Sequence, residues 1–178
     1  MSIDSLLEAL GSGGGTLAAL LADGAPAGDP EQPGMGAPEL AARGPRAAGH
    51  ESEYELLLEM ILEGSLLHYG RPRVVATDDR DLALLLGDQL YALGLSRLAE
   101  LGDLEAVSEL ADVISLLSQA QLSEDAQLAG AIWDAGAVAV GWGASAEYDA
   151  AKALARGGDA GATAALQECC GRALDQRF

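Results

Sequence analysis

Apolar residues recur every three or four positions along most of the chain after residue 50, which is the period of an amphipathic α-helix. The segment 53–68 gathers its apolar side chains on one broad face. Glu55, Glu59 and Glu63 recur every four residues on another face. Because like charges at this spacing repel each other, we expect the acidic stripe of this helix to face water.

The segment 82–101 carries leucine around almost its whole circumference. A helix that is apolar all round is a buried helix, so this segment is expected at the centre of the fold. Thr77 is the expected N-cap. Asp78, Asp79 and Asp81 then fall in the first turn, where the helix dipole favours negative charge.

Further helices are expected over 104–117 and after Ser123. Gly102 and Asp103 provide a stop and an N-cap for the first of them. The second runs through 128–146, which consists largely of Ala and Gly. It approaches the roughly 20 residues that span a bilayer. Because Ala and Gly contribute little transfer energy, the segment favours a tightly packed buried helix over a membrane span.

Two helical segments, 144–155 and 159–174, close the chain. No segment alternates with the period of two that a half-buried strand requires. The sequence therefore predicts an all-α protein, organised as a helical bundle.

The first 50 residues differ in composition from the rest. Five of the six prolines and many glycines fall in the region 23–50, which predicts a linker. Before it, two short apolar pieces, Ser2–Leu10 and Thr16–Ala22, are marginal helices because isolated helices of this length are weak in water. We therefore expect an N-terminal helical arm over 1–22, a linker over 23–50 and an α-helical domain over 51–178.

The chain is strongly acidic, with 10 Lys and Arg against 28 Asp and Glu and a formal net charge of −18. This balance excludes nucleic-acid binding and polybasic attachment to a membrane surface, because both need clustered basic side chains. Lys152 is the only lysine. The carboxylates are dispersed over the expected helix faces, so the acidity is a surface property that is compatible with a high-salt cytoplasm.

Cysteine usage and the N-terminal sequence both bear on location. Cys169 and Cys170 are the only cysteines, and adjacent cysteines rarely form a disulfide, so we expect a reducing compartment. The segment Met1–Leu10 carries Asp4 and Glu8 and no basic residue, which does not fit a secretory signal. We therefore expect a cytoplasmic protein.

Three successive segments carry a family resemblance: 59–68 (EMILEGSLLH), 84–95 (LLLGDQLYALGL) and 98–114 (LAELGDLEAVSELADVI). They resemble the trans-isoprenyl, or polyprenyl, diphosphate synthases. In that family a helix ending in Leu-Leu-His runs into a DDxxD motif, a basic loop follows, and the next helix contains Gly-Asp, as Gly87 and Asp88 do here. The resemblance covers roughly 51–143 and implies a truncated form of the terpenoid-synthase fold.

The family's catalytic motifs are missing from this sequence. Tyr69 and Gly70 stand where the first carboxylates would follow His68, and Leu128 and Ala129 stand where the family has Lys-Thr. No second aspartate-rich motif occurs near the C-terminus. These motifs hold the Mg²⁺ ions that neutralise the leaving diphosphate. The resemblance therefore implies a shortened, degenerate member that lacks both aspartate-rich motifs.

Five charged residues between the two leucine-rich segments are the candidate site residues. Arg71 and Arg73 lie where the family's diphosphate-binding arginines would fall, although surface ion pairing is the alternative. Asp78, Asp79 and Asp81 form the densest carboxylate cluster and could hold Mg²⁺. The alternative for these three is the charge pattern of a helix start, and Arg80 among them favours it.

Other residues have a structural and a functional interpretation. His68 is a candidate base, but no partner lies at a telling distance in sequence, so a helix C-terminal histidine is favoured. Of Trp133 and Trp142, we expect core packing by default, with one lining a pocket and the other an interface as the alternative. Gly87 and Gly94 share one helix face and favour the close approach of a second helix over a ligand cavity.

The predicted function is a non-catalytic regulatory or structural subunit in isoprenoid biosynthesis, without a cofactor. Its expected partner is a second copy of the chain or an active polyprenyl diphosphate synthase, since the family dimerises through helices of this region. One alternative is a residual Mg²⁺-dependent prenyltransferase that uses Asp78, Asp79, Asp81 and Arg71. The other is an isoprenoid-binding protein with a cavity against Gly87 and Gly94.

Overall fold

The chain folds into a helical bundle in a computed structural model that describes residues 3–12, 34, 36–75 and 77–175. These residues form eight α-helices and one short 3-10 helix, and none of them belongs to a β-strand. The expected all-α fold class is confirmed. None of the described helices is both long enough and apolar enough to cross a membrane.

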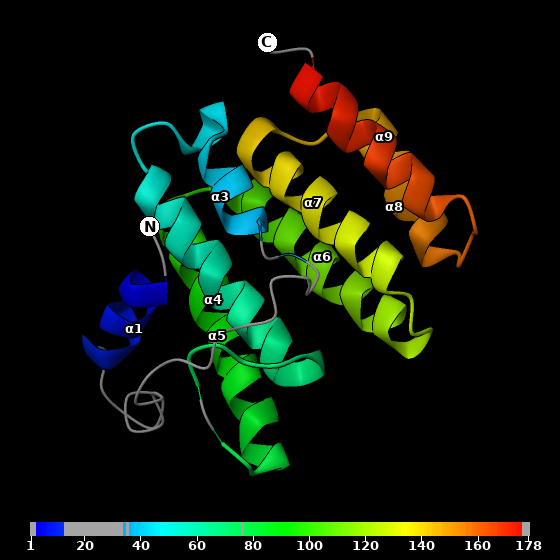
Figure 1. Cartoon of the computed structure of the whole chain (residues 1–178). Coiled ribbons are helices and arrows are strands. Elements are labelled where there is room, and N and C mark those ends of the chain that lie inside the picture. The colour runs from blue at the N-terminus through cyan, green and yellow to red at the C-terminus, as the bar shows by residue number, and fades with distance from the viewer. Residues whose placement is uncertain (1–2, 13–33, 35, 76, 176–178) are drawn as a thin grey trace.

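Two layers of helices make up the bundle. Helices α4 (Glu51–Tyr69) and α7 (Ala126–Trp142) lie in front of α5 (Arg80–Glu100) and α6 (Leu104–Leu122) in Figure 1. The hairpin of α8 (Ala146–Arg156) and α9 (Ala162–Asp175) packs on the far side of α7. The two C-terminal helices expected from the sequence are thus confirmed, and α4 and α7 form the centre of the molecule.

The leucine-rich helix α5 is not central, which corrects the expectation from its composition. Leu86, Leu90 and Leu98 are buried against the bundle, but Leu85 is 66% exposed. Helix α7 lies deeper because its Ala and Gly positions let neighbouring helices approach closely, as at Gly136, where a Cβ would lie 2.3 Å from Val113 Cγ2. Small side chains thus account for the burial of α7, whereas α4 is buried through large apolar side chains such as Leu58, Met60 and Ile61.

The second half of the predicted linker belongs to the packed fold. Residues 37–47 form α3 (Ala37–Ala42) and the 3-10 helix η1 (Pro45–Ala47), and α3 packs between α4 and α7. A Cβ on Gly44 would lie 2.1 Å from the Gly141 carbonyl oxygen. The segment packs its backbone directly onto α7, so a composition poor in large side chains does not prevent burial.

The N-terminal arm is present in part as α1 (Ile3–Ser12), which packs on α4. Leu6 and Leu10 are 0% and 3% exposed, so tertiary contact supplies the stability that such a short helix lacks alone. The second expected piece, Thr16–Ala22, lies outside the described residues.

Aspartate side chains cap the starts of α5, α6 and α7. Asp103 caps α6 by accepting a hydrogen bond from the Ala106 N–H at 3.0 Å, as expected. The expected cap at Thr77 and the expected helix start at Ser123 are wrong: Asp79 caps α5, Asp125 caps α7, and Ser123 follows the end of α6. Each true cap lies two residues later, where the carboxylate reaches the free N–H groups of the first turn.

Candidate functional site

The loop that joins α4 to α5 is anchored by a buried carboxylate. Glu63 is 0% exposed and accepts hydrogen bonds from the backbone N–H groups of Arg73 at 2.9 Å, Val74 at 2.8 Å and Val75 at 3.2 Å. These bonds give the loop the backbone partners that neither helix supplies. The expectation that Glu63 faces water is wrong, because the returning loop covers this side of α4.

The Arg73 side chain completes this cluster. Its Nη2 lies 2.6 Å from Glu59 Oε2 and its Nε lies 3.4 Å from Glu63 Oε2, with only 3% of the side chain exposed. Burial raises the pKa of Glu59, and the guanidinium opposes that shift. Both carboxylates that pair with Arg73 belong to α4. Arg73, predicted to contact a diphosphate, therefore forms an ion pair inside the fold. Arg71 is exposed.

The predicted metal cluster is spread over the start of α5. Asp79 accepts hydrogen bonds from the N–H groups of Asp81 at 3.0 Å and Leu82 at 3.1 Å. Asp78 and Asp81 are exposed. Nowhere in the described residues do three His, Cys, Asp or Glu side chains form a group that could hold a metal ion. The arrangement follows the helix-start pattern, with one carboxylate engaged by the backbone.

His68 has partners that lie far from it in sequence. Its Nε2 is 3.1 Å from Asp88 Oδ1 on α5, and its ring stacks on Tyr91 with a centroid distance of 5.3 Å. The sequence offered no partner because the turn between α4 and α5 brings residues 20 positions apart together. The available signal was Gly87, which predicted the close approach of a second helix one position before Asp88.

Gly87 and Gly94 serve helix packing, and no cavity lies against them. A Cβ on Gly87 would lie 2.6 Å from His68 Cδ2, and one on Gly94 would lie 2.8 Å from Ile61 Cδ1. The close approach of a second helix is therefore confirmed. The alternative of a ligand cavity at these two glycines is wrong, because side chains of α4 fill the space.

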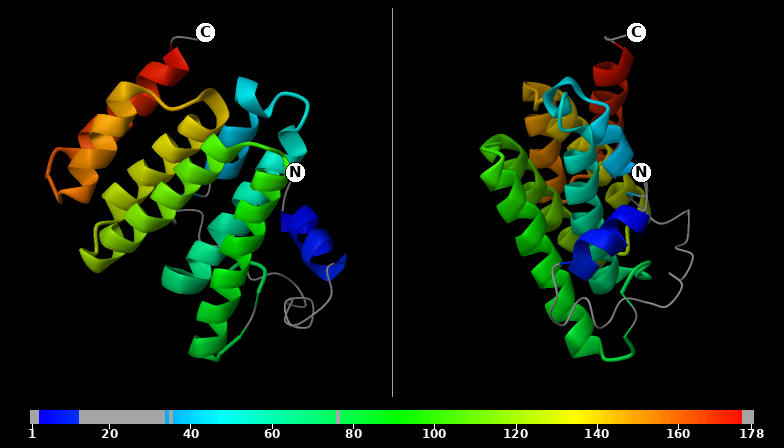
Figure 2. Two further views of the ribbon diagram at one scale, coloured as in Figure 1. Left: turned by 180° about the vertical axis from the view of Figure 1, so that it is seen from behind. Right: turned by 90° about the vertical axis from the view of Figure 1, so that its left-hand side faces the viewer.

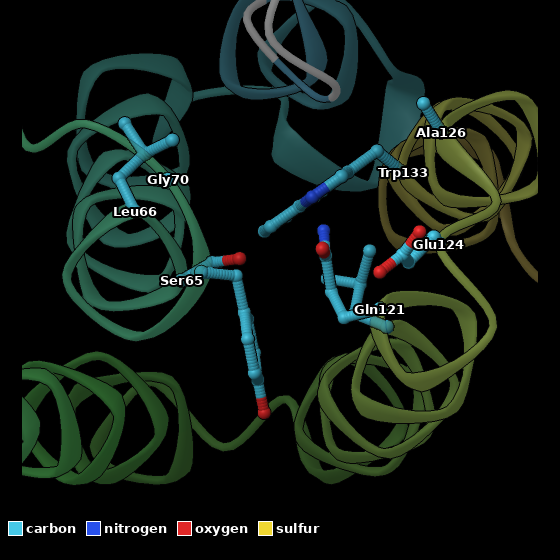
Figure 3. A pocket seen from close by; sticks show the side chains of 9 residues that line it. Ser65, Leu66, Gly70, Gln121, Glu124, Ala126 and Trp133 are labelled. Carbon is cyan, nitrogen blue, oxygen red and sulfur yellow. The ribbon is translucent and has the colours of Figure 1, made fainter.

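A cavity of about 320 Å³ lies instead between the C-terminal ends of α4 and α6 and the start of α7 (Figure 3). The side chains of Ser65 and Gln121 point into it, and the indole of Trp133 lies across it. The residues that line it come from α4, from the end of α6 with the following turn, and from α7: Ser65, Leu66, Tyr69, Gly70, Leu117, Gln121, Glu124, Ala126 and Trp133. Sequence reasoning named Trp133 but missed Ser65 and Gln121, whose residue types carry no motif.

The backbone at the rim of this cavity is unusual. Glu124 has a φ of +54°, and among the described residues it is the only one other than glycine with a positive φ. It sits in the short turn between α6 and α7. A left-handed conformation is strained for a residue with a Cβ, so this turn fixes the position of Glu124 at a local energetic cost.

The second tryptophan and the two cysteines lie at the other end of α7. Trp142 is half-buried and, with Cys169 and Arg172, lines a separate cavity of about 370 Å³. Both cysteines are free, and burial raises the pKa of each thiol. A raised pKa keeps a thiol protonated and unreactive, so these residues fit the structural interpretation.

Parts of α5 and α6 present uncharged residues to solvent, and the exposed Asp88 and Glu105 lie beside Leu85 and Leu104. From Gln89 to Ala99 every exposed residue of α5 is uncharged, and so is every exposed residue of α6 after Glu105. We define the outer face by these exposed residues and two exposed leucines: Leu85, Gln89, Ala92, Ser96, Ala99, Leu104, Ser108, Ala111, Ser115, Gln119 and Leu122. Both helices lie in the layer nearest the viewer when the molecule is seen from behind (Figure 2, left).

Leucines on the outer face are the most exposed large apolar side chains described. Leu85 is 66% exposed, Leu104 is 68% exposed and Leu122 is 86% exposed. Single exposed leucines are ordinary, but three of them, each at least 66% exposed, on two consecutive helices of a chain of charge −18 are not. This face has the chemistry of a contact surface.

Comparisons with protein-family models, with curated proteins and with solved structures find no match to this chain. The resemblance to the polyprenyl diphosphate synthases therefore stays a prediction.

Proposed function

We propose that this chain is a non-catalytic, polyprenyl-synthase-like protein that acts as a regulatory or structural subunit in isoprenoid biosynthesis. The observation that carries the proposal is the outer face, whose defining residues are uncharged and include three exposed leucines on α5 and α6. Burial of apolar surface is the main driving force of protein association, and charges are depleted at the centres of interfaces. The proposed role is therefore to bind another subunit through α5 and α6.

Two of the candidate site residues are held in contacts within the fold, which supports a role without catalysis. Arg73 is paired with two carboxylates inside the fold, and Asp79 holds the first turn of α5. Tyr69 and Gly70 occupy the end of α4, where the family resemblance would place metal-binding carboxylates. The polar groups of this region are used to hold the loop between the two helices.

A second copy of the chain is the partner that fits the outer face best. Two copies of charge −18 repel each other over most of their surfaces. A symmetric contact brings the same patch of both copies together, so an uncharged patch minimises this repulsion. An active polyprenyl diphosphate synthase is the other candidate partner. It would bind to the same outer face through a different surface of its own.

The oligomeric state tests the role of the outer face. We expect the full chain to be a dimer by light scattering after gel filtration, and Leu85→Glu or Leu104→Glu to yield a folded monomer, because each places a charge in the contact. Leu154→Glu is the matched control, since Leu154 is an exposed leucine on α8 and lies outside the face. A dimer that survives both outer-face variants overturns the assignment of this face.

Partner identity and catalysis need a second measurement. If the chain is monomeric alone, mixing it with an active polyprenyl diphosphate synthase should give a complex that Leu85→Glu disrupts. Incubation of the chain with isopentenyl and allylic diphosphates and Mg²⁺ should give no product. Robust turnover would reject the non-catalytic role, and a monomer that binds no synthase would reject the subunit role.

A further inference from the structure

We propose that the cavity between α4, α6 and α7 binds a small apolar molecule whose head group is a non-anionic hydrogen-bond donor, such as an alcohol or an amine. This site lies at the ends of α4 and α6 and is independent of the proposed role of the outer face. The argument rests on the shape of the cavity, its polar groups and its charge.

The cavity combines an apolar wall with a few convergent polar groups. Leu66, Leu117 and the indole of Trp133, each at most 5% exposed, close its inner end. The side chains of Ser65 and Gln121 point inward (Figure 3). A volume of about 320 Å³ is at the lower end of the range of small-molecule sites. Such a lining holds the body of a ligand by burial and its head group by hydrogen bonds.

The polar groups are held in place by the fold. Ser65 is 6% exposed and lies on the most enclosed part of α4, and Trp133 is 1% exposed on α7. Both therefore present their cavity-facing atoms without the entropy cost of ordering a surface side chain. Gln121 belongs to the last turns of α6, next to the strained turn.

The charge of the site selects against anions. None of the nine lining residues is Lys, Arg or His, and Glu124 adds a carboxylate at the rim. The net charge of −18 adds a repulsive field for a phosphate or a carboxylate. An alcohol or an ammonium donates hydrogen bonds to the oxygens of Glu124, Gln121 and Ser65 without that penalty.

Glu124 takes the left-handed conformation of a helix end, where the Asp125 N–H donates to the Ala120 carbonyl of α6 at 3.0 Å. A glycine would relieve the φ of +54° at position 124, yet the chain carries a glutamate whose carboxylate lies at the mouth of the cavity. Strained residues of this kind persist where surrounding contacts fix them, and they concentrate at ligand sites. We assign the Glu124 carboxylate as the group that contacts the head group of the ligand.

Fluorescence of Trp133 tests the proposal directly. The chain contains two tryptophans, so the Trp142→Phe variant leaves Trp133 as the only indole reporter. We expect 1-decanol and decylamine to change its emission saturably, and decyl phosphate, which has the same apolar body, to bind at least tenfold more weakly. Absence of saturable binding by the alcohol and the amine, or equal binding by the phosphate, overturns the proposal.

Variants in the same background locate the head group. Glu124→Gln should reduce the affinity for decylamine severalfold and leave the affinity for 1-decanol nearly unchanged, because it removes the charge at an exposed position. Gln121→Ala should weaken both ligands by up to about tenfold, the value of roughly one hydrogen bond. The control is Arg97→Gln, which lies in a different groove between α4 and α5. Equal affinities in all variants would place the ligands elsewhere.

The measurement separates this site from the subunit role. The same titration in the Leu85→Glu variant should give unchanged affinities, because Leu85 does not line the cavity. Lost binding in this variant alone, with its helical circular dichroism retained, would show that the cavity depends on association and would reject the independence claimed here.

Discussion

At the scale of single residues, buried polar groups decide the shape of the connection between α4 and α5. Glu63 has no exposed surface, yet it satisfies three backbone N–H groups and one guanidinium N–H of the loop that follows the helix. The sequence pattern assigns this glutamate to water because it counts only the helix on which the residue lies. The loop partner is 10 to 12 residues away and carries no sequence signal of its own.

Glu63→Gln should destabilise the protein by about 3 kcal/mol, because it leaves a buried guanidinium and backbone N–H groups with fewer acceptors. Urea unfolding followed by circular dichroism measures this change. The exposed Glu100→Gln variant is the control and should lie within about 0.5 kcal/mol of the wild type. A Glu63→Gln variant as stable as that control would show that the loop does not depend on this carboxylate.

Gly87→Ala should destabilise the protein by about 1 to 3 kcal/mol through overpacking. The added Cβ would meet His68 Cδ2 at 2.6 Å and the Gly64 carbonyl oxygen at 3.0 Å, and a backbone atom has little room to move. Gly130→Ala is a matched control on α7, because nothing lies within 4 Å of its added Cβ. That variant should gain up to about 1 kcal/mol in thermal unfolding experiments, since alanine is the better helix former.

At the scale of elements, charged clusters fasten helices that are distant in sequence. Asp103 caps α6 and also accepts hydrogen bonds from the Tyr54 hydroxyl of α4 and from Arg46 of η1. Burial raises the pKa of Tyr54 to about 12, and the neighbouring Asp103 carboxylate adds to this shift. Lys152 of α8, 4% exposed, pairs with Glu109 and Asp112 of α6. The only lysine of the chain thus fastens α8 to the bundle.

The stability of the protein should fall when the pH drops below about 4. Burial alone would raise the pKa of Asp103, but the Tyr54 hydroxyl, the Ala106 N–H and Arg46 outweigh it and hold this pKa below its ordinary value. The unfolded chain recovers the ordinary pKa of about 3.9, so it binds protons first and gains population as the pH falls. Asp112 behaves alike, because its hydrogen bonds from Arg156 and Lys152 outweigh its burial.

Urea unfolding between about pH 6 and about pH 3 measures this loss. Asp103→Asn should be less stable at neutral pH and should show a shallower decline on acidification, because one carboxylate with a lowered pKa is gone. An identical slope in wild type and variant would mean that other groups cause the acid sensitivity.

At the scale of the whole molecule, the most exposed leucines described lie on α5 and α6. The chain carries 28 acidic residues, and the exposed Asp81, Asp88, Glu100 and Glu105 border the outer face. Helix α5 retains exposed leucines because a two-layer bundle offers it only one neighbouring surface, formed mainly by α4. The leucines that the bundle leaves uncovered are those that we assign to the subunit contact.

Association through the outer face should tighten with salt. Repulsion between two copies of charge −18 acts over the Debye length, which shrinks from about 30 Å at 0.01 M salt to about 3 Å at 1 M. The dimer dissociation constant, measured by analytical ultracentrifugation, should therefore decrease as sodium chloride rises. Weaker association at high salt would indicate that ion pairs, and not the uncharged face, hold the subunits together.

The sequence by itself determined the helical class, the approximate helix boundaries after residue 50, the cap at Asp103 and the close packing at Gly87 and Gly94. These features are local, because helical period, capping and the absence of a Cβ depend on residues within one or two turns. The tertiary structure alone decided which helices are central, that residues 37–47 pack, and where the cavity lies. These depend on contacts between residues far apart in sequence: Glu63 with the loop, Gly44 with Gly141, and Ser65 with Trp133 across the cavity.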